Sequence, residues 1–92
     1  MMSDDVISEL LTLRVVVNQY GSVCYTNSAG LRHRKYGPAL IWADGTQFWL
    51  QNDILHRTDG PAVISPNDNS HEWWVHGQEM SEQEFNEWKV SE

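Results

Sequence analysis

Histidine and arginine occur side by side at two places in this chain. His33-Arg34 opens the segment HRKYGPALI, and His56-Arg57 opens the segment HRTDGPAVI. Histidine can bind a metal ion or transfer a proton near neutral pH, and arginine can bind carboxylates or phosphates. Six of the nine positions are identical, and recurrence at a fixed period is typical of a repeated supersecondary unit. The pairs therefore indicate either a duplicated site or a duplicated scaffold.

The histidines do not predict a metal site. Arginine follows His33 and His56, and its fixed charge disfavours a divalent cation nearby. His71 and His76 are five positions apart, so on a continuous strand they would face opposite sides. Cys24 is the only cysteine, and an isolated cysteine is more often a small buried hydrophobic residue. We expect no metal and no other cofactor.

The chain also lacks the motifs of familiar enzymes. It contains no G-x-S-x-G segment, no glycine-rich phosphate loop and no carboxylate pair that spacing alone places at a site. We therefore expect a protein that is not an enzyme. The repeated pair then has a structural role, in which arginine caps backbone carbonyls or pairs with an acid and histidine donates to a neighbouring strand.

Each repeat predicts a strand, a turn and a returning strand. The first hairpin is expected over 39–51 around a two-residue Asp44-Gly45 turn, and the second joins 62–64 to 72–75. A two-residue insertion in 66–70 would align Phe48 with Trp73, and Tyr25 would hold the same position in a degenerate earlier copy. The units are about 20–32, 33–55 and 56–80.

The two ends of the chain differ from the repeats. Ser81 and Glu84 form a capping-box pattern, with a hydrophobic staple between Met80 and Phe85, and they predict a helix over about 82–90. Near the other end, Ser3-Asp4-Asp5 could cap a short helix, and a strand is expected to start within 13–17. The predicted fold is mainly β (α+β): one domain, 1–92, with an antiparallel sheet of short hairpins, a C-terminal helix and a short N-terminal helix.

The composition is that of a small globular protein. With 92 residues, 40% of them hydrophobic and five of them Trp, the chain can form one compact core. A lone cysteine excludes an intrachain disulfide, and no apolar run approaches the roughly 18 residues of a membrane span. Asp4 and Asp5 stand where a signal peptide would carry positive charge. We expect a cytoplasmic protein with no membrane association.

Negative charge is concentrated towards the C-terminus. Residues 1–13 carry three acids and no base, 14–67 carry three acids and five bases, and 68–92 carry seven acids and one base, so the contributions are −3, +2 and −6. If the C-terminal helix packs through Phe85 and Trp88, its acids face solvent; they are Glu82, Glu84, Glu87 and Glu92. Such a surface favours a basic partner, although it could also serve only solubility.

Two other groups could contact a partner. Trp73 and Trp74 must point to opposite faces of a regular strand, so one of them is expected outward as a binding anchor, unless the terminal helix covers it. The only contiguous basic cluster surrounds His33 and could contact a phosphate backbone together with the second repeat's arginine. Its residues are Arg32, Arg34, Lys35 and Arg57.

The segments HRKYGPALIWADGTQFWLQND, LHRTDGPAVI and EWWVHG resemble tandem HR-x-x-GPA repeats, which are related to MORN repeats and occur in bacterial, bacteriophage and large-virus proteins. The resemblance covers about residues 20–80 and implies a sheet of short hairpins with a binding or scaffold role, without catalytic residues. The chain departs from the usual pattern at Asn52-Asp53, where a glycine is expected, and at Lys35-Tyr36, where an acidic pair is more typical.

A short acidic protein with such repeats also looks like a bacteriophage accessory protein, many of which block host restriction, toxin or CRISPR systems. The preferred hypothesis is an inhibitor that binds a basic, nucleic-acid-binding surface of a host protein or nucleoprotein complex. Its contacts would be Glu82, Glu84, Glu87, Trp73 and Trp74. The alternatives are a nucleic-acid contact through the basic residues and a MORN-like antitoxin or structural scaffold.

Overall fold

The computed structural model describes residues 4–91, and over this range the protein is mainly β with a helix near each end. The predicted fold class is therefore confirmed. The elements are α1 (Asp4–Thr12), β1 (Arg14–Val17), β2 (Val23–Thr26), β3 (Leu40–Ile41), β4 (Gln47–Phe48), β5 (Leu50–Gln51), β6 (Ile54–Leu55), β7 (Val63–Ser65), β8 (Ser70–Val75), β9 (Gln78–Met80) and α2 (Glu82–Ser91). Neither helix is long and apolar enough to cross a membrane.

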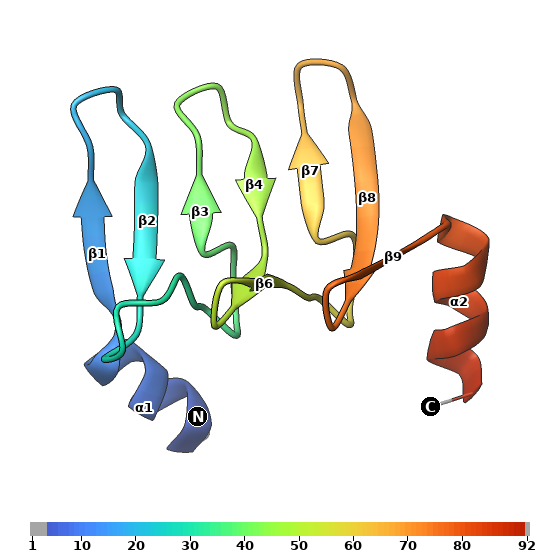
Figure 1. Ribbon diagram of the computed structural model, residues 1–92, viewed down its shortest axis with the longest axis horizontal. Helices are drawn as coiled ribbons and strands as arrows, with labels where there is room; N and C mark the ends of the chain where they lie inside the picture. The colour runs from blue at the N-terminus through green and yellow to red at the C-terminus, as the bar shows by residue number, and fades with distance from the viewer. Residues whose placement is uncertain (1–3, 92) are drawn as a thin grey trace.

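Seven strands form one antiparallel sheet in the order β1-β2-β3-β4-β7-β8-β9, and β5 and β6 form a separate two-stranded ladder. Figure 1 shows the hairpins β1-β2, β3-β4 and β7-β8 side by side, with the connecting segments 27–39 and 49–62 along one end, α1 beneath β1 and β2, and α2 beside β8. Successive hairpins are hydrogen-bonded to one another, since Cys24 pairs with Leu40 and Phe48 pairs with Val63. The repeats therefore extend one sheet laterally.

The hairpin predicted over 39–51 is present as β3 and β4, but Leu50 and Gln51 pair with β6 instead of β3, and the turn is longer than expected. Trp42 N donates to Thr46 O at 2.9 Å, and Gly45 N donates to Trp42 O at 2.9 Å. The loop is therefore the three residues 43–45, not the pair Asp44-Gly45. Gly45 has φ of 94°, as expected when a type I turn is followed by one left-handed residue.

The strand register corrects the predicted alignment of the repeats. Ser65 pairs with Ser70, so the second hairpin's loop has four residues and the insertion is one residue, not two. Tyr25 N and Trp49 N donate to Ala39 O and Ala62 O, both at 2.7 Å. Tyr25 therefore corresponds to Trp49, and by the same count to Trp73, whereas Phe48 corresponds to Glu72.

Two further strands, β6 and β9, follow two-residue turns that the sequence did not predict. Asn52 and Asp53 have φ of 51° and 66°, and His76 and Gly77 have φ of 51° and 77°. Positive φ at both central residues defines the type I′ hairpin turn. In the first turn the Asp53 carboxylate accepts hydrogen bonds at 2.8 Å from both Nε and N of Arg32, which lower its pKa. These bonds hold Asp53 in a conformation that otherwise favours glycine.

The predicted elements at both ends are present. Glu84 N donates to Ser81 Oγ at 3.1 Å and Ser81 N donates to Glu84 Oε1 at 2.8 Å, which confirms the capping box. The second bond holds the pKa of Glu84 below its usual value. Phe85 is buried, so α2 is anchored through its apolar face. Of the residues named from the sequence, Ser3 and Glu92 lie outside the described residues.

The sheet has little packed against it. The buried apolar residues of the chain are few, and within 4–91 no large side chain is fully buried. They are Ala39, Leu50, Ala62, Val63, Val75 and Phe85. The accessible surface is 6177 Å². A compact monomer of the same mass, 10.6 kDa, is expected to expose about 5500 Å². The protein therefore exposes more surface than its mass requires.

Candidate interaction surfaces

The arginine of each repeat stacks on an aromatic ring of the preceding hairpin. Arg34 Cζ lies 4.1 Å from the centroid of the Tyr25 ring, and Arg57 Cζ lies 3.8 Å from the centroid of the Trp49 ring. Each guanidinium also donates through Nη1 to a proline carbonyl of its own block, at 3.4 Å for Arg34 and 3.0 Å for Arg57. The predicted capping of carbonyls is therefore present, and the arginine joins two successive hairpins.

The glycine of each repeat leaves room for that arginine. A Cβ on Gly37 would lie 2.8 Å from Arg34 Cζ, and a Cβ on Gly60 would lie 3.0 Å from Arg57 Cζ. The alanines that follow, Ala39 and Ala62, are both 0% exposed. The Arg-x-x-Gly-Pro-Ala pattern is thus explained by packing and hydrogen bonding alone.

The histidine of each repeat caps the next two-residue turn, but as an acceptor. Asn52 N donates to His33 Nδ1 at 3.1 Å, and His76 N donates to His56 Nδ1 at 2.9 Å. The prediction that histidine donates to a neighbouring strand is therefore wrong at this nitrogen, because an accepting Nδ1 must be unprotonated. The pKa of His56 is lowered, first by burial and then by His76, whose ring centroid lies 4.3 Å away.

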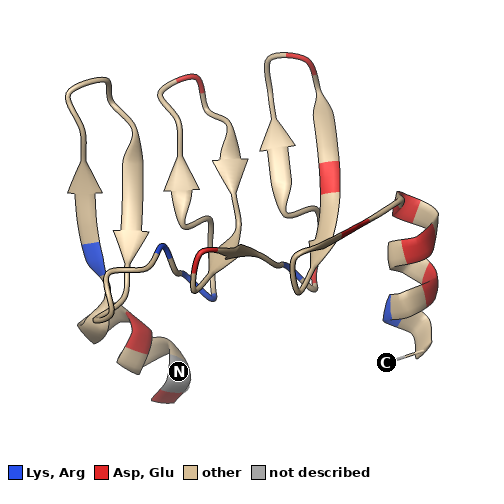
Figure 2. Ribbon diagram, viewed as in Figure 1, with Lys and Arg blue, Asp and Glu red and all other residues tan. Residues whose placement is uncertain are grey.

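The basic residues of the nucleic-acid hypothesis are engaged within the chain. Arg32 pairs with Asp53 at 2.8 Å, and Arg57 pairs with Asp59 at 2.8 Å, which lowers the pKa of Asp59. Arg34 is half-buried on its aromatic ring. Figure 2 shows the blue segments of this region separated along the loop end of the sheet, with acidic segments near them. The structure therefore does not gather these residues into one unpaired basic patch.

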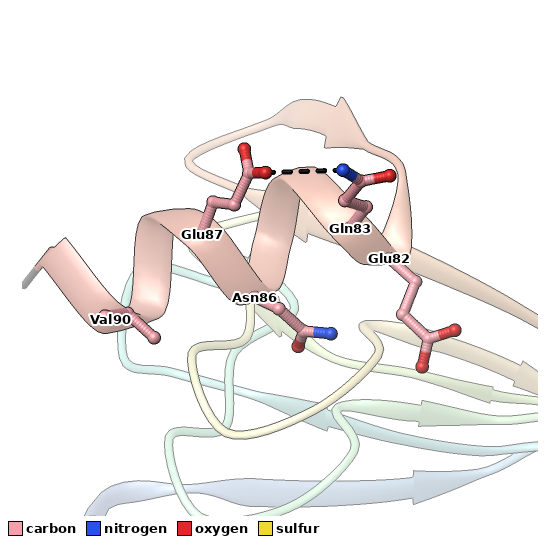
Figure 3. A pocket seen from close by; sticks show the side chains of 5 residues that line it. All are labelled: Glu82, Gln83, Asn86, Glu87 and Val90. Atoms are coloured by element: carbon pink, nitrogen blue, oxygen red, sulfur yellow. Dashed lines mark hydrogen bonds between the residues drawn. The ribbon is translucent and has the colours of Figure 1, made fainter.

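The acidic residues of α2 divide into two kinds. Glu82 and Glu87 are exposed and line a shallow depression on the helix together with Gln83, Asn86 and Val90 (Figure 3). Val90 is 88% exposed, so an apolar side chain lies beside the carboxylates. Glu84 does not line this depression, because its carboxylate closes the capping box. Figure 2 shows the concentration of negative charge along α2.

The tryptophans differ in exposure. Trp73 and Trp74 are both half-buried, so neither is fully exposed. Trp74 Nε1 donates to Glu72 Oε1 at 2.9 Å, and the β8–β9 pairing sets Trp73 opposite Met80. The exposed tryptophan is Trp42, whose exposed fraction is 47%. Its position next to a hairpin turn, where neighbouring strands end, was the signal in the sequence that could have identified it.

Within residues 4–91, no three His, Cys, Asp or Glu side chains are grouped in a way that could hold a metal ion. Cys24 is half-buried, and burial raises the pKa of its thiol. A raised pKa disfavours the reactive thiolate. Among the predicted contact residues, Glu82 and Glu87 of α2 are exposed.

No protein-family model, no curated protein and no solved structure matches this chain.

Proposed function

We propose that this protein is a non-enzymatic binding module, of the bacteriophage-inhibitor type, that blocks a basic, nucleic-acid-binding surface of a host defence or other nucleoprotein complex. The observation that carries the proposal is the outer face of α2, where Glu82 and Glu87 are exposed and the exposed Val90 lies near the other end of the helix. Exposed carboxylates attract lysine and arginine, and the apolar side chain beyond Glu87 supplies contact area on docking.

The way α2 is held supports this role. Its first turn is closed by the capping box, Phe85 is buried, and Lys89 Nζ donates to Thr58 O at 2.6 Å near its other end. A helix that is already ordered loses little conformational freedom on binding, which favours affinity. The charge of −6 over residues 68–92 would also speed the encounter with a basic surface.

The test is a comparison of the wild-type protein with a Glu82→Gln/Glu87→Gln variant. Both are immobilised and exposed to a bacterial lysate, and captured proteins are eluted with single-stranded DNA. We expect the wild type to retain nucleic-acid-binding proteins that DNA displaces, and the variant to bind them at least about tenfold more weakly with a shallower dependence on salt. A Glu82→Asp/Glu87→Asp variant keeps the charge and serves as the matched control.

Three results would contradict the proposal. Equal affinity and equal salt dependence for the wild type and the Gln variant would exclude the outer face of α2. Tight binding of labelled DNA or RNA by the protein itself, weakening steeply with salt and lost in Arg32→Ala/Lys35→Ala, would favour the nucleic-acid alternative. A captured partner that DNA does not displace would favour the antitoxin or scaffold alternative.

A further inference from the structure

The strand β1 is an open edge of the sheet. It is first in the strand order, and its one neighbour in the sheet is β2. Asn18 N donates to Ser22 O at 3.0 Å, and hydrogen-bonded pairs alternate along an antiparallel ladder, so Val16 is bonded to β2 whereas Val15 and Val17 are not. The N–H and C=O groups of Val15 and Val17 therefore point away from the sheet, ready to pair with another strand.

The two edges of the sheet are protected to different degrees. β9 has three residues, includes the charged Glu79, and leads directly into α2, which packs against β8 and β9. β1 is uniformly exposed, and its three valines are 54–64% exposed. Short length, charge and helical cover are the usual ways in which proteins prevent edge-to-edge pairing. The three-residue β9 edge combines Glu79 with contacts to α2, whereas the four-residue β1 edge carries one charge, Arg14, beside three exposed valines.

The chain as a whole exposes enough surface for one partner. Its exposed area of 6177 Å² exceeds the compact-monomer expectation by roughly 700 Å², and a stable dimer covers about 800 Å² on each subunit. Exposed apolar side chains also precede and follow β1 in the sequence, since Leu10, Leu11 and Tyr20 are 62%, 80% and 74% exposed.

We propose that β1 pairs with β1 of a second copy of this chain, antiparallel about a twofold axis through Val16, so that the two sheets become one. In this register Val15 of each copy lies opposite Val17 of the other, and their outward N–H and C=O groups form four hydrogen bonds. Arg14 then lies opposite Asn18 of the second copy, which keeps the two arginines apart. A self-complementary strand closes as a twofold dimer and leaves no further edge of this kind.

Sedimentation equilibrium of the full chain tests the proposal independently of the function of α2. At a protein concentration of about 100 μM we expect the mass of a dimer, which is twice the 10.6 kDa of one chain. Val16→Lys places two charges together on the axis and is expected to give a monomer, whereas Val90→Lys, at the 88% exposed Val90 of α2, is expected to leave the dimer intact. A monomeric wild type, or a dimer unaffected by Val16→Lys, would overturn the proposal.

A second variant guards against misfolding, and disulfide trapping checks the register. Val15→Pro removes only an outward N–H, so it should abolish the dimer while the circular dichroism spectrum stays that of the wild type. In a Cys24→Ser background, Val16→Cys should cross-link readily, whereas Arg14→Cys should not, since the two residues 14 would be about 13 Å apart. Equal cross-linking at both positions would contradict the register.

Discussion

The two HR-x-x-GPA blocks have the same contacts at their identical positions and different contacts at their variable positions. Arg34 and Arg57 both stack on the preceding hairpin, and the histidines both accept from the next turn. At the variable positions, the amides of Lys35 and Tyr36 donate to the Glu9 carboxylate of α1 at 2.8–3.2 Å, whereas the carbonyl of Thr58 accepts from Lys89 of α2. The identical residues therefore build the sheet, and the variable residues attach the helices.

Removing the stacked arginine should have the largest effect on stability, and the effect should differ between the blocks. Arg57→Ala loses a ring contact, a carbonyl bond at 3.0 Å and the Asp59 pair, whereas Arg34→Ala loses a ring contact and a longer carbonyl bond. We expect losses of about 3 and about 2 kcal/mol in the free energy of unfolding. Urea denaturation measures both. If both variants lost less than about 0.5 kcal/mol, the arginines would not join the hairpins.

The two type I′ turns should differ in their response when a side chain is added at Gly77 or removed at Asp53. Gly77 has φ of 77°, and a Cβ there would lie 3.1 Å from Ile54 Cγ2, so Gly77→Ala should cost about 1.5 kcal/mol. The corresponding Asp53 already has a side chain, which Arg32 holds. Asp53→Gly should therefore change the urea midpoint much less, because relief of strain offsets the lost bonds. A larger effect at Asp53 than at Gly77 would contradict this account of the turns.

Lowering the pH should destabilise the folded protein at the second block, because His56 becomes protonated. The folded pKa of His56 lies below its ordinary value of 6.5, so the unfolded chain binds the proton more tightly and stability falls as pH decreases from about 6.5 through the folded pKa. Burial is the larger cause of the lowered pKa and His76 the second; His76 lines the same depression as His56. Urea midpoints between pH 7.5 and 5.5 should decline, and His56→Asn, which keeps an acceptor that cannot be protonated, should flatten the decline. An unchanged slope in that variant would assign the effect to other groups.

The helix attachments should have the smallest and most local effects. Glu9→Gln leaves an amide nitrogen where two backbone N–H groups now meet a carboxylate, so hydrogen exchange should accelerate in α1 and at residues 35–36. Lys89→Met should accelerate exchange in the last turn of α2 only. Acceleration throughout the sheet in either variant would show that the helices stabilise more than their own attachment points.

Local sequence signals predicted the local structure well. The capping box at Ser81 and Glu84 and the hairpin around Gly45 depend on residues within a few positions of one another, and both are present. The turns at Asn52-Asp53 and His76-Gly77 were both missed, and the first of them contains no glycine. The conformation of that first turn depends on Arg32, which is distant from Asp53 in the sequence, and such a contact has no local pattern.

The surfaces were predicted only in part, because exposure depends on register. The acidity of α2 follows from composition, whereas the separation of Glu84 from Glu82 and Glu87 follows from its place in the cap. Because the insertion was predicted one residue too long, Trp73 was aligned with Phe48 instead of with Trp49. The stacking of arginine on an aromatic ring was missed for the same reason, because the strand register determines which aromatic residue lies beneath the arginine.

Because each arginine holds the hairpin that precedes it, the architecture has a direction and can grow by whole units. If another copy were inserted before His56, its arginine would stack on Trp49 and Arg57 would stack on its aromatic ring. Neither terminal helix would need to change. The last ring of the series, Trp73, lies opposite Met80 at the end of β9 instead of beneath another arginine. Chain length in such a protein can therefore change in discrete steps, and the C-terminal helix marks where the series stops.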